Sequence, residues 1–274
     1  MKPFLVLLGA LSLLLTQSSA TFAQDDAKKV KLRWFGQSMF QLETANGKSV
    51  VFDPQIIPVF GPPRLIADVT LISHPHNDHN QLEALKEKGR VFEGVKPKGK
   101  TSEWAAIDEK VGAIRVRSLG TFHDAVNGMQ RGKNSIWVVE TDGLNIVHLG
   151  DLGHELTAAQ IKAIGNVDVL MIPIGGIYTL NGDQAKKVVG QLKPRLFVVP
   201  MHYGVPGWDE LLGPDEFLGE FEKSEIRKLP DTNELVIPVD LKADAPTVVL
   251  LGWKTPAKPE PKKEPEKKDA PKKP

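Results

Sequence analysis

The stretch His74-Pro75-His76-Asn77-Asp78-His79 places three imidazoles and one carboxylate within six residues, directly after the apolar run at 69–73. The whole chain of 274 residues has only seven histidines, so this density is not a product of composition. A strand that ends in a loop stiffened by proline can direct neighbouring side chains to a common point. Imidazole and carboxylate are ligands for borderline divalent ions such as zinc. The stretch therefore predicts a buried strand followed by one part of a metal site.

Three further candidate ligands are spread along the chain. His123, Asp151 and His202 each lie just after an apolar run that is typical of a strand. Polar residues that follow separate strands commonly meet at one edge of a sheet. Together with the hexapeptide they make five histidines and two aspartates, which is enough to hold two metal ions.

The residues between the two ends of the chain, 24–253, fit one α/β or α+β domain. Asn46-Gly47 and Asp142-Gly143 are two-residue hairpin signals. Helical patterns bounded by capping residues cover 80–88, 157–164 and 182–192. Strand-like runs lie at 30–35, 38–43, 49–52, 69–73, 113–117, 135–140, 145–148, 167–173, 196–200 and 247–251. Early hairpins and later strand–helix alternation predict sheets that are covered by helices on their outer faces.

Composition excludes several classes of protein. The chain is 41% hydrophobic and 25% charged, as in ordinary globular domains, and has no cysteine. Disulfides, a thiol nucleophile, a cysteine zinc site and a lipoprotein anchor are therefore excluded. Residues 24–253 carry 26 basic and 30 acidic groups, so this part of the chain has no electrostatic footprint for nucleic acid.

The first 23 residues are typical of a secretory signal peptide. Lys2 precedes a charge-free apolar run at 4–15, and the small residues at Ser18 and Ala20, or those at Thr21 and Ala23, suit a signal peptidase. We expect cleavage after Ala23 and a periplasmic or extracellular protein. An uncleaved anchor is the alternative, although the run is short for a bilayer, which needs about 20 residues.

The last 21 residues, 254–274, form a segment of low complexity rich in Lys, Glu and Pro. It contains eight lysines against four acidic residues and almost nothing apolar, so we expect disorder. The segment acts either as a solubilising tail or as a basic tether that makes weak contact with an anionic cell surface.

The motifs together resemble those of the metallo-β-lactamase superfamily, which is marked by HxHxDH, a separate His, an Asp after Gly and a last His. All of these occur here in that order across residues 74–202. The phrases at 122–124, 131–135, 148–154, 173–176 and 200–203 are similar to those of its small metal-dependent hydrolases, the ascorbate-6-phosphate lactonase-like branch. The resemblance covers about residues 30–253 and implies an α+β fold, a four-layer αββα sandwich with a dinuclear centre at the sheet edge.

The resemblance also implies a division of the ligands between two divalent ions, with zinc as the first choice and manganese or iron as alternatives. The first ion would be held by His74, His76 and His123, the second by Asp78, His79 and His202, and Asp151 would bridge both. The implied nucleophile is a water or hydroxide between the ions, and Asp78 would orient it or accept its proton.

Several neighbours of the predicted ligands are candidates for lesser roles. Asp53, Asp124 and His148 are expected to support the ligands, with His148 buried in its strand. His154 is either a proton donor to the leaving group or an ordinary loop residue. Tyr178 and Tyr203 each either present a hydroxyl to substrate or form a packing wall of the pocket.

The sequence thus predicts an exported metal-dependent hydrolase that acts on an ester, lactone or phosphodiester of small-molecule size. The alternative is a non-catalytic envelope module that uses the metal structurally and is attached through its basic tail. Nucleic-acid processing, known in the superfamily, is disfavoured by the acidic body and by the lack of room for an additional domain.

Overall fold

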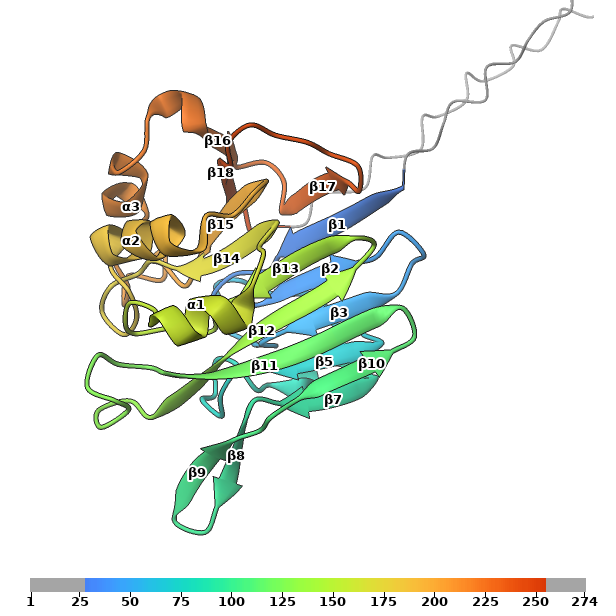
Figure 1. Cartoon of the computed structure of the whole chain (residues 1–274), viewed down its shortest axis with the longest axis vertical. Coiled ribbons are helices and arrows are strands. Elements are labelled where there is room, and N and C mark those ends of the chain that lie inside the picture. Colours follow the sequence, from blue (N-terminus) through green and yellow to red (C-terminus); the bar gives the residue numbers. More distant parts are fainter. Residues whose placement is uncertain (1–27, 255–274) are drawn as a thin grey trace, which may run out of the picture.

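Two mixed β-sheets stack face to face in the computed structural model, which describes residues 28–254 (Figure 1). The predicted signal peptide at 1–23 and all of the predicted tail beyond Lys254 lie outside the described residues. No helix within 28–254 is long and apolar enough to span a bilayer.

The first sheet has the strand order β17-β1-β2-β3-β5-β7. Strands β17 to β3 pair antiparallel, whereas β3, β5 and β7 run parallel, so β3 and β5 point their carboxyl ends toward the same edge. The strands are β1 (Lys29–Trp34), β2 (Phe40–Glu43), β3 (Ser49–Phe52), β5 (Val69–Ile72), β7 (Arg90–Glu93) and β17 (Glu234–Pro238). The hexapeptide therefore starts near this edge, two residues after the end of β5.

The second sheet has the order β10-β11-β12-β13-β14-β15-β18-β16 and the same plan, antiparallel up to β13 and parallel beyond it. Its strands are β10 (Asp108–Val111), β11 (Ile114–Phe122), β12 (Lys133–Thr141), β13 (Leu144–His148), β14 (Val169–Pro173), β15 (Phe197–Met201), β16 (Ile226–Leu229) and β18 (Thr247–Leu251). His123, Asp151 and His202 follow β11, β13 and β15, and every strand-like run expected from the sequence overlaps a strand of the structure.

Three helices come from the second half of the chain and lie beside the second sheet (Figure 1). They are α1 (Ala158–Ile164), α2 (Gly182–Leu192) and α3 (Asp215–Gly219). Thr157 and Asn181 each close a capping box with a glutamine three residues later. The helices expected at 157–164 and 182–192 are thereby confirmed.

The helix expected at 80–88 is wrong. This segment forms the 3₁₀ turn η1 (Leu82–Ala84) and the strand β6 (Leu85–Glu87), which pairs parallel with β4 (Leu65–Ile66). The Asn80 side chain donates to the Pro75 carbonyl instead of capping a helix. Apolar residues of η1, β4 and β6 cover the outer face of the first sheet in a cluster of Phe35, Met39, Val51, Leu65, Ala67, Ala84 and Leu85.

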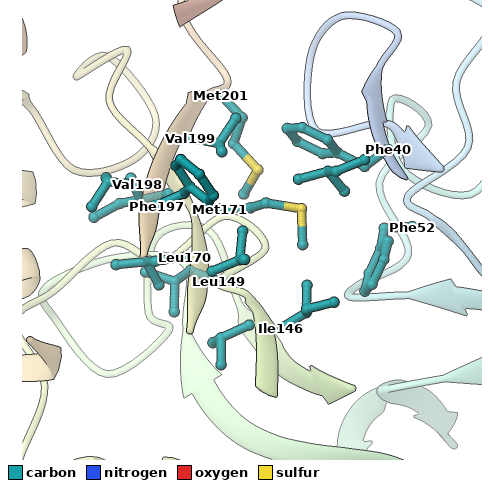
Figure 2. Close-up of a cluster of buried hydrophobic side chains, with 14 of the residues drawn as sticks. Phe40, Phe52, Ile146, Leu149, Leu170, Met171, Phe197, Val198, Val199 and Met201 are labelled. Atoms are coloured by element: carbon teal, nitrogen blue, oxygen red, sulfur yellow. The ribbon is translucent and has the colours of Figure 1, made fainter. Parts of the chain in front are cut away.

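The main core fills the space between the two sheets. Figure 2 shows Phe40 and Phe52 of the first sheet facing Ile146 and Met171 of the second. These four side chains are fully buried. The remaining short elements are the hairpin β8 (Val95–Lys98) and β9 (Thr101–Trp104), which projects from the sandwich in Figure 1, and the 3₁₀ turn η2 (Lys223–Glu225). Burial of this apolar surface holds the two sheets, and hence their loop edges, together.

Candidate metal centre

Asp53 fixes both ends of the hexapeptide loop. It follows β3 in a left-handed conformation with φ of 41° and is fully buried. Its carboxylate accepts hydrogen bonds from the Ser73 amide at 2.7 Å, the Ser73 hydroxyl at 2.6 Å and His79 Nδ1 at 2.8 Å. Asp53 is thus placed to support ligands rather than to act as one.

The first group of candidate ligands is His74, His76 and His123, whose ligand atoms all lie within 4.8 Å of one another. The Ser73 hydroxyl donates its hydrogen bond to the Asp53 carboxylate. The Ser73 oxygen also lies 2.9 Å from His74 Nδ1, and this ring nitrogen therefore donates to it. His74 Nε2 is left unprotonated, 3.0 Å from His76 Nδ1. Burial lowers the pKa of His74 well below its usual value, which favours the neutral form that binds metal.

The second group is Asp78, His79, Asp151 and His202, again within 4.8 Å of one another. His79 Nε2 lies 3.1 Å from Asp151 Oδ2 and 3.3 Å from Asp78 Oδ2. Burial alone would lower the pKa of His79, but the carboxylates of Asp151, Asp78 and Asp53 outweigh burial and raise it well above its usual value. Three carboxylates around one imidazole make a site that attracts a cation.

Asp151 joins the two groups. Its Oδ2 lies 3.1 Å from His79 Nε2, 3.1 Å from His123 Nε2, 3.0 Å from His202 Nε2 and 3.8 Å from His74 Nε2. Burial would raise the pKa of Asp151, but the nearby His202 and His79 hold it well below its usual range. One carboxylate oxygen at the meeting point of four imidazoles has the position of a bridging ligand.

The chemistry of these side chains fits a site for divalent metal. His79 Nε2 is buried and has no hydrogen-bond partner within residues 28–254, although two carboxylates lie close to it. Nitrogen and oxygen atoms that converge without hydrogen-bond geometry are what metal coordination requires. The donor set of imidazole and carboxylate suits zinc, manganese or iron.

His148 supports the site from inside the core and lies outside both ligand groups. Its Nε2 donates to the Ser38 carbonyl at 2.9 Å, and its Nδ1 accepts from the Gly150 amide at 3.1 Å. The ring stacks on Phe52 with centroids 5.1 Å apart. His148 therefore fixes the turn that carries Asp151.

Asp124 organises a loop instead of contacting the ligand groups. Its carboxylate accepts from four main-chain amides at 2.7–3.0 Å, those of Val126, Gly128, Gln130 and Arg131. Burial would raise the pKa of Asp124, but these amides lower it. A charged acceptor with four donors gives the loop between β11 and β12 a defined shape.

The structure argues against His154 as a proton donor. Its Nδ1 donates to the Glu155 carbonyl at 2.7 Å and its Nε2 accepts from the Phe122 amide at 3.2 Å. Both ring nitrogens are thus used by the main chain, and His154 does not line the pocket over the metal ligands.

The two tyrosines differ in position. Tyr203 is 4% exposed, stacks on Trp34 with centroids 5.1 Å apart and is absent from the pocket wall, so it is a packing residue. Burial raises the pKa of Tyr203. Tyr178 is 40% exposed and lines the pocket, where a substrate can reach it.

Two residues near the ligands were not expected from the sequence. Gln37 is buried and has a left-handed main-chain conformation with φ of 50°. Its side-chain Nε2 donates to Asp78 Oδ2 at 2.8 Å, and its main-chain carbonyl accepts from the His202 amide. The Asn134 side chain accepts from the Asp151 amide at 3.0 Å. Nothing in the sequence marks Gln37 as a site residue, because it lies in a short turn without charged residues. Asn134 could have been found, because it belongs to the phrase at 131–135 that resembles those of the small hydrolases.

A pocket of about 380 Å³ opens over the two ligand groups. Its floor is made by five of the candidate ligands, and its wall by Gln130, Arg131 and Tyr178, which belong to two loops. The volume suits a small molecule.

Known proteins similar to this chain are named as metal-dependent hydrolases. A curated protein of Pyrococcus abyssi named as a metal-dependent hydrolase is 29% identical over 239 residues, 75% of this chain and 100% of the relative. A protein of the same name from Thermoplasma acidophilum is 29% identical over 199 residues, 64% of this chain and 84% of the relative.

Solved structures have the same fold. A crystal structure from Thermotoga maritima, assigned to the metallo-β-lactamase superfamily, is 33% identical with a TM-score of 0.61 and covers 81% of this chain and 98% of its own. A metallo hydrolase from Ignicoccus hospitalis, 22% identical, has a TM-score of 0.56 and covers 76% of this chain and 98% of its own. The metallo-β-lactamase fold expected from the sequence is confirmed. Residues 31–202, more than half of the chain, match the family described as the beta-lactamase superfamily domain, and this protein belongs to that superfamily.

Proposed function

We propose that this protein is an exported hydrolase that cleaves an ester, lactone or phosphodiester bond of a small molecule with a water activated by two divalent ions, zinc first among them. Its family and its relatives make it a metal-dependent hydrolase. The observation that carries the dinuclear part is Asp151 Oδ2, which lies 3.0–3.1 Å from one imidazole of the first group and two of the second.

The ligands divide as the two groups indicate. His74, His76 and His123 would hold one ion, while Asp78, His79 and His202 would hold the other and Asp151 both. When bound, two such ions would lower the pKa of a water and neutralise charge that develops on the substrate oxygen.

Asp78 is the ligand whose surroundings suit a second task. Its side chain is 34% exposed, whereas the side chains of Asp151 and His202 are 2% exposed. Gln37 donates to Oδ2 of Asp78 and leaves the other carboxylate oxygen available to accept a hydrogen bond from the attacking water. Asp78 therefore orients the water, and Gln37 holds Asp78 in place.

The test is metal analysis combined with a panel of lactones, esters and phosphodiesters, on the wild type and on Asp78→Ala. We expect about two metal equivalents and hydrolysis for the wild type, and loss of one equivalent and of activity for the variant. Asp183→Asn, which removes an exposed carboxylate that pairs with Lys187, is the control and should match the wild type. Metal-loaded wild type that is inert on the whole panel would favour the non-catalytic envelope module.

Export rests on the apolar leader and the small residues before Gln24. Mass analysis of protein from the periplasm or the medium should give a chain that starts at Gln24. A chain that keeps its leader in the membrane fraction would instead support the uncleaved anchor. The basic segment at 254–274 is proposed to make weak contact with an anionic cell surface, and a chain that ends at Lys254 should lose that contact.

A further inference from the structure

The pocket wall contains a cation that none of the proposed steps uses. Arg131 lines the pocket together with His76, Asp78, His123, Asp151 and His202. Building on the function proposed above, we propose that Arg131, held against Tyr178, binds an anionic group of the substrate, a carboxylate or a phosphate, and thereby selects acidic substrates.

The Arg131 guanidinium has donors to spare. One of its nitrogens donates to the Ile177 carbonyl at 3.0 Å, and its carbon lies 4.7 Å from the centre of the Tyr178 ring. A guanidinium has five N–H donors, and within residues 28–254 no carboxylate pairs with this one. Five other arginines do pair with carboxylates, namely Arg33, Arg90, Arg115, Arg117 and Arg195. Arg131 is thus free to form the bidentate contact that a carboxylate or phosphate offers.

The fold orients this cation before any substrate arrives. The Arg131 amide donates to the Asp124 carboxylate at 2.7 Å, which fixes the main chain at the base of the side chain. The stacking on Tyr178 and the bond to the Ile177 carbonyl then fix its far end. A donor held in this way loses little conformational entropy when a ligand binds.

The charge of the pocket also favours an anion. Asp78 and Asp151 are the two carboxylates that line it, and Arg131 is its one arginine among the described lining residues. Two divalent ions would outweigh the two carboxylates, so the loaded pocket would be cationic with Arg131 on one wall. A cationic pocket raises the local concentration of anionic substrates.

The experiment compares three 4-nitrophenyl esters on zinc-loaded protein. They are the hydrogen glutarate, its neutral methyl ester, and the 3-phosphonopropanoate. We expect the wild type to prefer one or both anionic esters over the neutral one by about tenfold or more in kcat/KM, as a charge-assisted contact allows. The anionic ester with the higher kcat/KM shows whether the site prefers a carboxylate or a phosphate-like group.

Arg131→Met keeps an apolar stem and removes the charge. It should abolish the preference, because the kcat/KM of the anionic esters falls by about tenfold or more relative to that of the neutral ester, which does not use the contact. Arg90→Met removes the same charge from the protein surface and should keep the preference. An equal preference in wild type and Arg131→Met would overturn the proposal, and so would a wild type that prefers the neutral ester.

A binding measurement separates this proposal from the hydrolytic one. Calorimetry with glutarate on zinc-loaded wild type and Arg131→Met should show weaker binding to the variant, by about tenfold, because the contribution of the metal is common to both. If the wild type hydrolyses no ester but this difference appears, the anion site stands and the proposed reaction fails. Equal binding refutes the anion site. If Arg131→Met does not fold, Tyr178→Ala serves instead, because it removes the face on which Arg131 rests.

Discussion

At the scale of single residues, the site depends on carboxylates that bind no metal as much as on those that do. Asp53 accepts the Nδ1 proton of His79, which leaves Nε2 as the nitrogen that faces Asp78 and Asp151. It also accepts the Ser73 hydroxyl, whose oxygen in turn fixes the tautomer of His74. One side chain thus sets the ligand atoms of both groups.

We predict that Asp53→Asn weakens metal binding by about 10–100-fold, the usual cost of losing a partner of this kind. The amide nitrogen of Asn donates, so it cannot accept from Ser73 and His79 as the carboxylate does. The measurement is a zinc titration against a competing chelator. Asp68→Asn, which removes a carboxylate bonded to Lys48 and Ser49 in the same sheet, is the control. Equal affinities for both variants would remove Asp53 from this role.

We predict that His154→Gln lowers kcat less than about threefold and leaves the pH profile unchanged, because a proton donor would be worth about 10²–10⁴-fold. The free energy of unfolding should fall by about 1 kcal/mol, because one Gln amide group cannot both donate to the Glu155 carbonyl and accept from the Phe122 amide as the imidazole ring does. Activity across pH and thermal unfolding check both statements. A loss of the acidic or basic limb of the profile would restore the catalytic role.

The sequence predicts candidate ligands better than it predicts their surroundings. His74, Asp78 and His202 have chemistry and spacing that mark them, and the structure gathers them where strands end. Gln37 has neither, because its effect depends on a left-handed turn and a partner 41 residues away. His154 has the right residue type beside Asp151, but the bonds that occupy both its nitrogens depend on the path of the main chain.

At the scale of elements, regular strands were predictable and short irregular ones were not. The run at 247–251 coincides with β18, and α2 begins directly after its capping Asn181. The segment at 80–88 has a helical pattern, yet its apolar side chains are used to cover the first sheet and its main chain pairs with β4. Tertiary contacts of this kind override local preference and leave no trace in a single sequence.

Close packing between elements gives the next prediction. A methyl group on Gly153 would collide with the main chain of His123 and Asp124, whereas one on Gly190 in α2 meets nothing within 4 Å. Gly153→Ala should lower the free energy of unfolding by about 1–3 kcal/mol and reduce zinc affinity, because the His123 loop must shift. Gly190→Ala should raise the free energy of unfolding by about 0.5–1 kcal/mol.

Denaturant unfolding and zinc titration of both glycine variants measure these effects. Unchanged zinc affinity in a folded Gly153→Ala protein would show that the His123 loop adapts without moving its imidazole. A destabilised Gly190→Ala protein would contradict the open space found around α2.

At the scale of the whole molecule, the ligands connect the two sheets. His74, His76 and His79 follow β5 of the first sheet, whereas His123, Asp151 and His202 follow strands of the second. Bound ions would therefore link halves that are otherwise joined mainly by the apolar core shown in Figure 2. An ion that binds only the folded protein stabilises it by mass action.

We predict that chelation lowers the melting temperature. With free zinc at about 1,000 times its dissociation constant the gain is about 4 kcal/mol, which corresponds to about 8–16 °C for a domain of this size. Calorimetry with and without a chelator checks this. The melting temperature of Asp151→Ala should change little with chelator, because this variant lacks the carboxylate that lies between the two ligand groups. An identical response in wild type and variant would mean that zinc acts elsewhere.

The residues that line the pocket fall into two sets. The ligands stand at strand ends fixed by the sheets, while Gln130, Arg131 and Tyr178 stand on two loops that contribute no ligand beyond His123 at the start of the first. Substitutions at Gln130, Arg131 and Tyr178 can therefore alter which substrates the protein accepts while His123 and the other ligands stay in place. Such modularity makes this chain a convenient scaffold for engineering, in which new specificities are grafted onto an unchanged reaction centre.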